Sequence, residues 1–128
     1  WQDPDFVQKQ MKARGCRPNK SELFLLQELE NFSSGQWLYV GDGRDKNYII
    51  GGRVPDFVHT TKPLLIELFG DYWHGKDFRG LPVEEHVQER INYFLQRGYQ
   101  TLIVWEHDLQ NQEILKQKIV GFIDFTCE

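Results

Sequence analysis

The chain has 128 residues, of which 40% are hydrophobic and 14% aromatic, and its formal net charge is −4 at pH 7. This length fits one domain with one core. The lack of a signal-peptide pattern, or of an apolar run near the roughly 20 residues of a membrane span, predicts a cytoplasmic protein without a membrane partner. The negative charge counts mildly against a domain that binds nucleic acid through a bulk positive potential, because such domains usually carry a basic excess.

The first predicted helix begins at Asp3 and Pro4, a capping residue followed by proline in the first helical position. Five of the twelve residues from 9 to 20 are basic. This run either forms a solvated helix end and loop or faces phosphate groups. We therefore treat residues 1–19 as an N-terminal helix with a basic linker, ahead of a single core domain at residues 20–128.

A second helix is predicted from the capping residue Ser21 to Phe32, because its apolar residues recur at helical spacing. Strand-like runs follow, separated by glycine-rich and Thr-Thr-Lys-Pro turns, at residues 37–40, 47–50, 54–59 and 64–69. Short turns between successive strands indicate antiparallel pairing. We therefore expect this middle section to form an antiparallel part of a sheet.

A glycine-rich loop at 70–81 leads into a helix that is predicted from Pro82 until Gly98 ends it. A continuous apolar strand at 101–105 comes next, and a last helix is predicted over 114–123. A strand, a crossover helix and a second strand imply a parallel pair. Together these elements predict an α/β fold whose central mixed sheet has four to five strands and is flanked by helices.

One carboxylate, Glu67, stands within an apolar strand. Burying a lone carboxylate costs several kcal/mol unless it is paired, protonated or bound to a metal. Asp56 lies eleven positions earlier, and adjacent antiparallel strands, about 4.8 Å apart, could bring both carboxylates to one end of the sheet. Magnesium is usually held by one or two carboxylates together with waters and substrate phosphates. The pair therefore predicts a Mg²⁺ site, in which Mn²⁺ could substitute.

Further candidate residues come from a helix and a loop. Glu22 falls in the apolar stripe of the second helix, four residues before Leu26 and seven before Leu29. It either faces the site or, in the first helical turn, only complements the helix dipole. His74 could serve as a general base or stabilise developing charge, although a loop histidine is often an ordinary surface residue. Asp71, in the same loop, either supports the site or is only a loop residue.

Three segments carry a resemblance to a known family. They are the Pro-Asp-Phe-Val run at 55–58, the Ile-Glu-Leu-Phe-Gly-Asp-Tyr-Trp-His-Gly run at 66–75, and Gly98 followed by the Thr-Leu-Ile-Val-Trp-Glu run at 101–106. In this order they resemble the very-short-patch repair endonucleases of the PD-(D/E)XK nuclease superfamily, and the chain looks closest to their relatives among phage and intron homing endonucleases. The resemblance covers roughly residues 20–110. It implies an αβββαβ nuclease core, and a protein that is encoded by a bacterium or a phage.

The resemblance also implies roles for single residues. It makes Asp56 the metal-binding aspartate of the superfamily and Glu67 the acidic position of the (D/E)xK element. It makes Glu22 the helix glutamate that completes the site, and His74 the histidine beside the scissile phosphate. A backbone carbonyl near Leu68 would also meet the metal. These roles imply metal-dependent hydrolysis of phosphodiester bonds in double-stranded DNA.

The chain departs from this family at two places. The wider superfamily has a lysine two residues after the acid, whereas this chain has Phe69, so no lysine can activate water from that position. The repair enzymes bind a structural zinc ion through several cysteines, whereas this chain has Asp71 at one such position and contains only Cys16 and Cys127. These departures argue against zinc and against mismatch-specific repair. They favour the homing branch, in which a separate DNA-recognition region, missing here, commonly joins the catalytic domain.

The expected partner is double-stranded DNA, with contacts from Lys20, Arg53, Trp73 and Lys76. Cutting both strands with one active site per chain would require a homodimer. Two alternatives stay open. The first is a catalytically inactive nuclease-like fold that acts in DNA binding or protein assembly, which the missing lysine favours. The second is a glycosidase that uses the two strand carboxylates as its acid pair.

Overall fold

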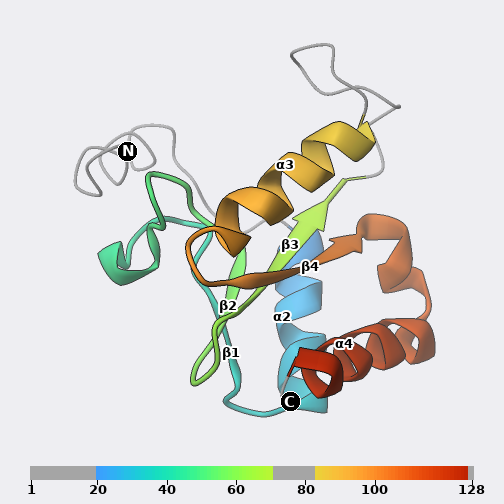
Figure 1. Ribbon diagram of the computed structural model, residues 1–128. Helices are drawn as coiled ribbons and strands as arrows, with labels where there is room; N and C mark the ends of the chain where they lie inside the picture. Colours follow the sequence, from blue (N-terminus) through green and yellow to red (C-terminus); the bar gives the residue numbers. More distant parts are fainter. Residues whose placement is uncertain (1–19, 71–82, 127–128) are drawn as a thin grey trace.

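The computed structural model describes residues 20–70 and 83–126 (Figure 1). The first predicted helix lies outside the described residues. The same holds for four candidates of the glycine-rich loop, which are Asp71, Trp73, His74 and Lys76. Their proposed roles stay predictions.

A four-stranded mixed sheet forms the centre of the described chain, with the strand order β1-β2-β3-β4. The strands are β1 (Trp37–Tyr39), β2 (Phe57–His59), β3 (Leu64–Phe69) and β4 (Gln100–Trp105). β1 pairs with β2 and β2 with β3 in antiparallel fashion, whereas β3 and β4 are parallel. The predicted α/β fold, with its mixed sheet and antiparallel middle section, is confirmed.

Within the described residues, three α-helices flank this sheet: α2 (Lys20–Phe32), α3 (Val83–Leu95) and α4 (Gln112–Thr126). α3 connects the parallel strands β3 and β4, as the strand-helix-strand pattern predicts. α3 covers one face of the sheet, and α2 and α4 lie on the other (Figure 1). None of the described helices has the length and apolar character that a membrane crossing requires.

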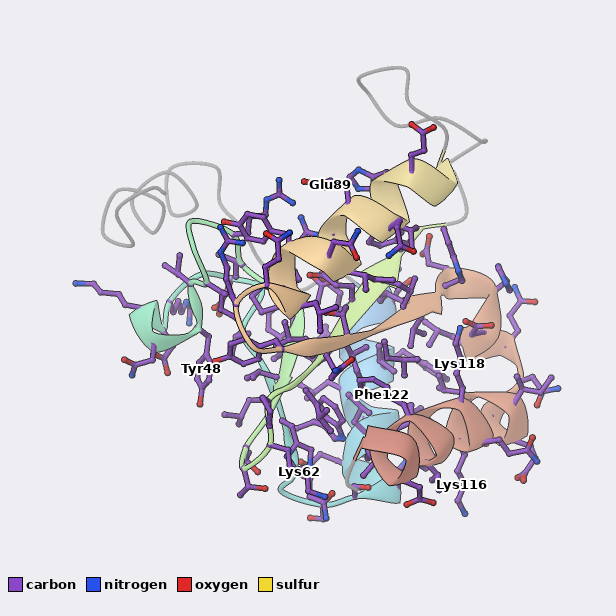
Figure 2. The ribbon with its side chains drawn as sticks, viewed as in Figure 1. Tyr48, Lys62, Glu89, Lys116, Lys118 and Phe122 are labelled. Carbon is purple, nitrogen blue, oxygen red and sulfur yellow. The ribbon has the colours of Figure 1, made fainter. Side chains whose placement is uncertain are left out.

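Two hydrophobic clusters fill the space between the sheet and its helices, because successive side chains of a strand point to opposite faces. The larger cluster joins α2 and α4 to the sheet through Leu25, Leu29, Trp37, Phe57, Leu64, Ile66, Val104, Leu115 and Ile119. Phe122 of α4 packs against this cluster (Figure 2). The smaller cluster lies under α3 and contains Val40, Ile50, Val58, Leu65 and Phe94. The face beneath α3 is also the face that carries the candidate site.

The strand that the apolar pattern predicts at 47–50 does not form. A 3-10 helix, η1 (Lys46–Tyr48), replaces it, because the Asp45 side chain accepts a hydrogen bond from the backbone N–H of Asn47 at 3.0 Å. Ile50 then forms only an isolated bridge to Arg53. An aspartate that bonds the nearby backbone stabilises a turn in competition with a sheet ladder. Local polar chemistry therefore overrides the apolar pattern here.

A second 3-10 helix, η2 (Glu106–Gln110), links β4 to α4 and was not predicted from the sequence. Asp108 of η2 accepts a hydrogen bond from the backbone N–H of Trp105 at 2.9 Å. The same carboxylate pairs with Lys118 of α4 at 2.9 Å (Figure 2). Asp108 therefore fixes η2 against both neighbouring elements. Its pKa is lowered because these hydrogen bonds and the Lys118 charge together exceed the opposing effect of burial.

Candidate active site

Asp56 and Glu67 lie opposite each other at one end of the sheet. The antiparallel register pairs Phe57 with Ile66 and Val58 with Leu65, so one further step along the strands brings Asp56 opposite Glu67. Both side chains then share the face that α3 covers, because alternate residues of a strand point to the same side. The sequence-based prediction that the strands bring these two carboxylates together therefore agrees with the register.

Asp56 immediately precedes β2 and is partly buried. Its Oδ2 atom accepts a hydrogen bond from the backbone N–H of Leu68 at 2.8 Å, which fixes the carboxyl group against β3. Its own carbonyl accepts bonds from the backbone N–H groups of Val40 and Gly41, at 2.9 and 3.2 Å. Asp56 is therefore held from two neighbouring chain segments at once.

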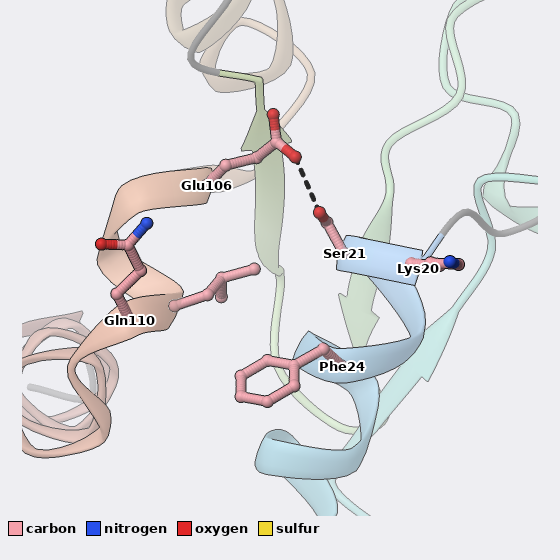
Figure 3. A pocket seen from close by; sticks show the side chains of 6 residues that line it. Lys20, Ser21, Phe24, Glu106 and Gln110 are labelled. Carbon is pink, nitrogen blue, oxygen red and sulfur yellow. Dashed lines mark hydrogen bonds between the residues drawn. The ribbon is translucent and has the colours of Figure 1, made fainter.

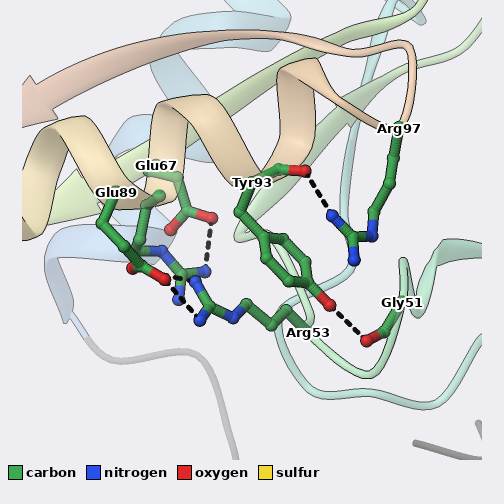
Figure 4. A network of polar contacts seen from close by, with 7 residues as sticks. Gly51, Arg53, Glu67, Glu89, Tyr93 and Arg97 are labelled. Atoms are coloured by element: carbon green, nitrogen blue, oxygen red, sulfur yellow. Dashed lines mark hydrogen bonds and ion pairs between the residues drawn. The ribbon is translucent and has the colours of Figure 1, made fainter. Parts of the chain in front are cut away.

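Glu67 lies within β3, and its residue surface is only 3% exposed. Its Oε1 atom accepts a hydrogen bond from Nη2 of Arg90, which lies on α3, at 2.8 Å (Figure 4). The charge that seemed out of place in an apolar strand is thus paired. Arg90 was not among the predicted site residues. It lies three residues after Val87 and four before Phe94, so a cation within the apolar stripe of this helix was the available signal.

The two strand carboxyls are harder to ionise than usual. Burial raises the pKa of Asp56 well above its ordinary value, and the charge of Glu67 raises it further, although the Leu68 N–H acts in the opposite direction. Burial also raises the pKa of Glu67, against the opposing effect of the Arg90 charge. A hydrogen bond between the two carboxyl groups helps Glu67 to ionise. Both carboxyls therefore bind a proton more readily than an exposed acid does.

Arg90 supplies the positive charge beneath α3. Burial would lower the pKa of its guanidinium, but the Glu67 carboxylate more than offsets this, and the pKa of Arg90 is raised. The charge of Asp56 adds to the same effect. Arg90 therefore stays protonated and stabilises the ionised form of its partner.

Glu22 reaches the same end of the sheet from α2. Its charge raises the pKa values of Asp56 and Glu67, after the larger effects of burial and of their nearest charged neighbours. The hydroxyl of Tyr39 on β1 donates a hydrogen bond to Glu22. Burial, and then the Glu22 charge, raise the pKa of this hydroxyl far above its usual range. The structure thus gathers three predicted residues, Glu22, Asp56 and Glu67, which we call the carboxylate cluster.

Phe69 lies at the position where the sequence resemblance would place a lysine. It is 6% exposed, and its ring meets that of Trp105 edge-on, with the centroids 5.3 Å apart. On the other side its centroid lies 5.6 Å from that of His86 on α3. Rings from two elements therefore pack around this position. Arg90, one helical turn further along α3, is the cation that contacts the carboxylate cluster.

The donor chemistry of the cluster suits a hard divalent cation. Asp56 and Glu67 offer carboxylate oxygens, which Mg²⁺ prefers, and burial is the main cause of their raised pKa values. Among residues 20–70 and 83–126, no group of three or more His, Cys, Asp or Glu side chains is arranged to hold a metal ion. An ion at this place would have to be held by the two strand carboxylates, with water and substrate as its other ligands.

The two described candidates for DNA contact differ in their surroundings. Lys20 begins α2 and is exposed. Arg53 instead forms a two-pronged ion pair with Glu89 of α3, at 2.5 and 2.9 Å (Figure 4). Its guanidinium also lies over the ring of Tyr93, 3.9 Å from the centroid. Contact with a phosphate would require Arg53 to exchange or share this pairing.

Comparisons with known protein families, with curated proteins and with solved structures found no match to this chain.

Proposed function

We propose that this chain is the catalytic domain of a metal-dependent endonuclease that hydrolyses phosphodiester bonds in double-stranded DNA. The observation that carries the proposal is the carboxylate cluster itself. Asp56 lies opposite Glu67 at the end of neighbouring strands, and Glu22 reaches them from α2. Three acids that gather in a partly buried place are unfavourable for folding, and such arrangements are typical of functional sites.

In this proposal Asp56 and Glu67 hold Mg²⁺ or Mn²⁺. The ion would polarise the scissile phosphate and lower the pKa of an attacking water. Asp56 gives up its proton when it binds the ion, because a metal ligand must be deprotonated. Glu22, which accepts the hydrogen bond from Tyr39, orients the attacking water. His74, which lies outside the described residues, is proposed to move a proton at the phosphate.

Arg90 has two tasks in this proposal. Its hydrogen bond at 2.8 Å fixes the carboxylate of Glu67 in one orientation. It also places a permanent positive charge beside the cluster, in a chain whose Phe69 leaves the usual lysine position apolar. The guanidinium cannot act as a base at neutral pH. Arg90 is therefore a positioning residue, and activation of water falls to the other residues.

The decisive experiment incubates the protein with supercoiled plasmid DNA and Mg²⁺, with EDTA as the control. We expect nicked or linear product only when the metal is present. Asp56→Asn should abolish cleavage while circular dichroism shows an intact fold, because the amide is a poor metal ligand. Asp124→Asn, which changes an exposed aspartate of α4, should leave cleavage unchanged. Full activity of Asp56→Asn would disprove the assignment.

A specific observation supports a second candidate, a catalytically inactive nuclease-like fold that acts in DNA binding or assembly. Arg90 already neutralises Glu67, so the strand carboxylate has a partner without any metal. Calorimetric titration with Mg²⁺ or Mn²⁺ separates the two candidates. An active nuclease should bind the ion, and Asp56→Asn should remove this binding. An inactive fold should give no binding heat in either protein.

A further inference from the structure

A groove with a volume of about 410 Å³ lies beside the carboxylate cluster, between the first turns of α2 and the 3-10 helix η2 (Figure 3). It is lined by Lys20, Ser21, Phe24, Glu106, Leu109 and Gln110. This volume falls within the range of small-molecule sites, roughly 300 to 1,000 Å³. The groove is therefore large enough for one flat ring system.

The groove opens at the same end of the sheet as the cluster. On the α2 side, Ser21 directly precedes Glu22. On the other side, Glu106 directly follows Trp105, which pairs in register with Phe69 at the end of β3. Because β3 and β4 are parallel, their final residues meet at one edge. A ligand in the groove would therefore lie at the same edge of the sheet as the cluster, on the side of α2.

The lining combines apolar faces with polar groups that accept hydrogen bonds. Phe24 is 41% exposed although it is a large apolar residue, and its ring forms the α2 side of the groove (Figure 3). The Oε2 atom of Glu106 accepts a hydrogen bond from the Ser21 hydroxyl at 2.7 Å, which spans the groove at one end. Gln110 adds an amide from η2. Beside the Glu106 carboxylate this groove favours a neutral ring with N–H donors, whereas Lys20 supplies a cation on the α2 side.

We infer that this groove binds one unpaired nucleobase with an exocyclic amino group, as adenine, cytosine and guanine have, beside the phosphate that the cluster acts upon. The inference rests on the proposed function. Phe24 supplies a face for stacking, which tolerates any base. Glu106 accepts from the amino group of cytosine and Gln110 suits the amino and ring nitrogens of adenine. Thymine, which offers a carbonyl in place of the amino group, is disfavoured beside the carboxylate.

The test measures binding of short single-stranded oligonucleotides of deoxyadenosine, deoxycytidine or thymidine to the whole chain in EDTA. Fluorescence anisotropy should give tighter binding for the first two than for thymidine. Phe24→Ala should weaken all three by about tenfold, because a stacked base is lost, and Phe24→Leu should also weaken binding, which guards against a folding defect. Leu23→Ala, at a more exposed position of the same turn that does not line the groove, is the matched control.

Glu106→Gln gives the sharper result. The amide oxygen of the new glutamine can still accept a hydrogen bond from the Ser21 hydroxyl, so this side of the groove keeps its position. Its amino group can also donate a hydrogen bond to the thymine carbonyl. We expect the preference for adenine and cytosine over thymine to fall severalfold, with overall affinity nearly retained. Equal binding of the three oligonucleotides by the unchanged protein, or a preference that survives Glu106→Gln, would overturn the inference. Because these measurements need no metal or cleavage, they can fail while plasmid cleavage succeeds, and the reverse.

Discussion

The two ends of β2 both bury an ionisable group, but they surround it differently. Before the strand begins, burial and the charge of Glu67 raise the pKa of Asp56. At the end of the strand, His59 is only 5% exposed, and its Nδ1 atom accepts hydrogen bonds from the backbone N–H groups of Thr61 and Lys62, both at 3.2 Å. Burial, and then the charge of Lys62, lower the pKa of His59. At both ends, burial favours the neutral form.

The difference lies in how the buried group is satisfied. Local backbone donors serve His59, and its ring packs edge-on against Trp37 with the centroids 5.0 Å apart. Its Nε2 atom is buried without a hydrogen-bond partner among the described residues, so only the Nδ1 side of the ring is satisfied locally. Asp56 instead shares its surroundings with Glu67 and Glu22, and Arg90 offsets part of this negative charge by its ion pair with Glu67. Folding must therefore overcome repulsion at the Asp56 end, as is common at functional sites, where stability and activity compete.

The largest change in stability is expected when Arg90 is substituted. Arg90→Met removes the guanidinium 2.8 Å from Glu67, whose side chain is 4% exposed. Leaving a buried carboxylate without its partner costs about 3 to 5 kcal/mol. Because the Arg90 side chain is itself 20% exposed, we expect a loss near the lower limit, about 3 kcal/mol in the free energy of unfolding at neutral pH. Urea denaturation measures this directly.

The loss at Arg90 should also depend on pH. Without the arginine, the folded-state pKa of Glu67 rises further, and an acid with a raised pKa contributes stability that is lost as the pH rises through its folded-state pKa. The deficit should therefore be larger at neutral pH than in mild acid. Lys116→Met, at an exposed lysine of α4, should change stability by less than about 0.5 kcal/mol. Equal losses in the two variants would show that Glu67 does not depend on Arg90.

A smaller effect with the opposite sign is expected at Asp56. Asp56→Asn should increase the free energy of unfolding at neutral pH by about 1 kcal/mol, because the unfolded chain ionises Asp56 freely, whereas the folded protein must keep this buried acid protonated or hold it ionised beside Glu67. The Asn side-chain oxygen can still accept the Leu68 N–H. A gain in stability with loss of cleavage is the combination typical of a functional residue.

The pH dependence checks the same change. Between the ordinary pKa of 3.8 and its raised folded-state pKa, Asp56 is protonated in the folded protein and ionised in the unfolded chain. Stability therefore falls as the pH rises through this window, and Asp56→Asn should flatten that part of the curve. Asp124→Asn should not. A variant that is less stable than the unchanged protein at every pH would mean that the Asp56 carboxylate supports the fold.

Local patterns predicted most of the fold and part of the site. The helical spacing of apolar residues predicted α2, α3 and α4, because the face that each helix buries is formed by residues of a few consecutive turns. The turn between β2 and β3 is short, so the Asp56–Glu67 pairing also followed from neighbouring sequence. The predicted strand at 47–50 does not form, because the hydrogen bond from the Asn47 N–H to the Asp45 side chain stabilises a turn in competition with strand pairing.

Contacts between distant elements could not be predicted in this way. The partner of Glu67 lies 23 positions away on α3, and its choice depends on how that helix lies on the sheet. Glu28 is a clearer case, because it is only 7% exposed and accepts a bond at 3.4 Å from Gln112, which is 84 positions away. Spacing within α2 gave no reason to bury it. The hydrogen bond between Ser21 and Glu106, which are 85 positions apart, likewise could not be predicted from local spacing.

The smallest effect is expected at His59, as a change in pH dependence. Its folded-state pKa is lowered below 6.5, so the unfolded chain binds the proton more readily, and stability is lost as the pH falls through the unfolded-state value. The sign is opposite to that of Asp56. A single titrating group changes stability by at most about 1.4 kcal/mol per pH unit.

His59→Asn keeps an acceptor near the N–H groups of Thr61 and Lys62 but cannot take up a proton. Urea denaturation from neutral pH into mild acid should give a smaller loss on acidification than in the unchanged protein. His107→Asn, at a side chain that is 61% exposed, should have no such effect. Because acid favours the Asp56 end and opposes the His59 end, their single variants should change the slope of stability against pH in opposite directions. Changes in the same direction would mean that the two ends titrate alike, and that repulsion among carboxylates does not set the Asp56 end apart.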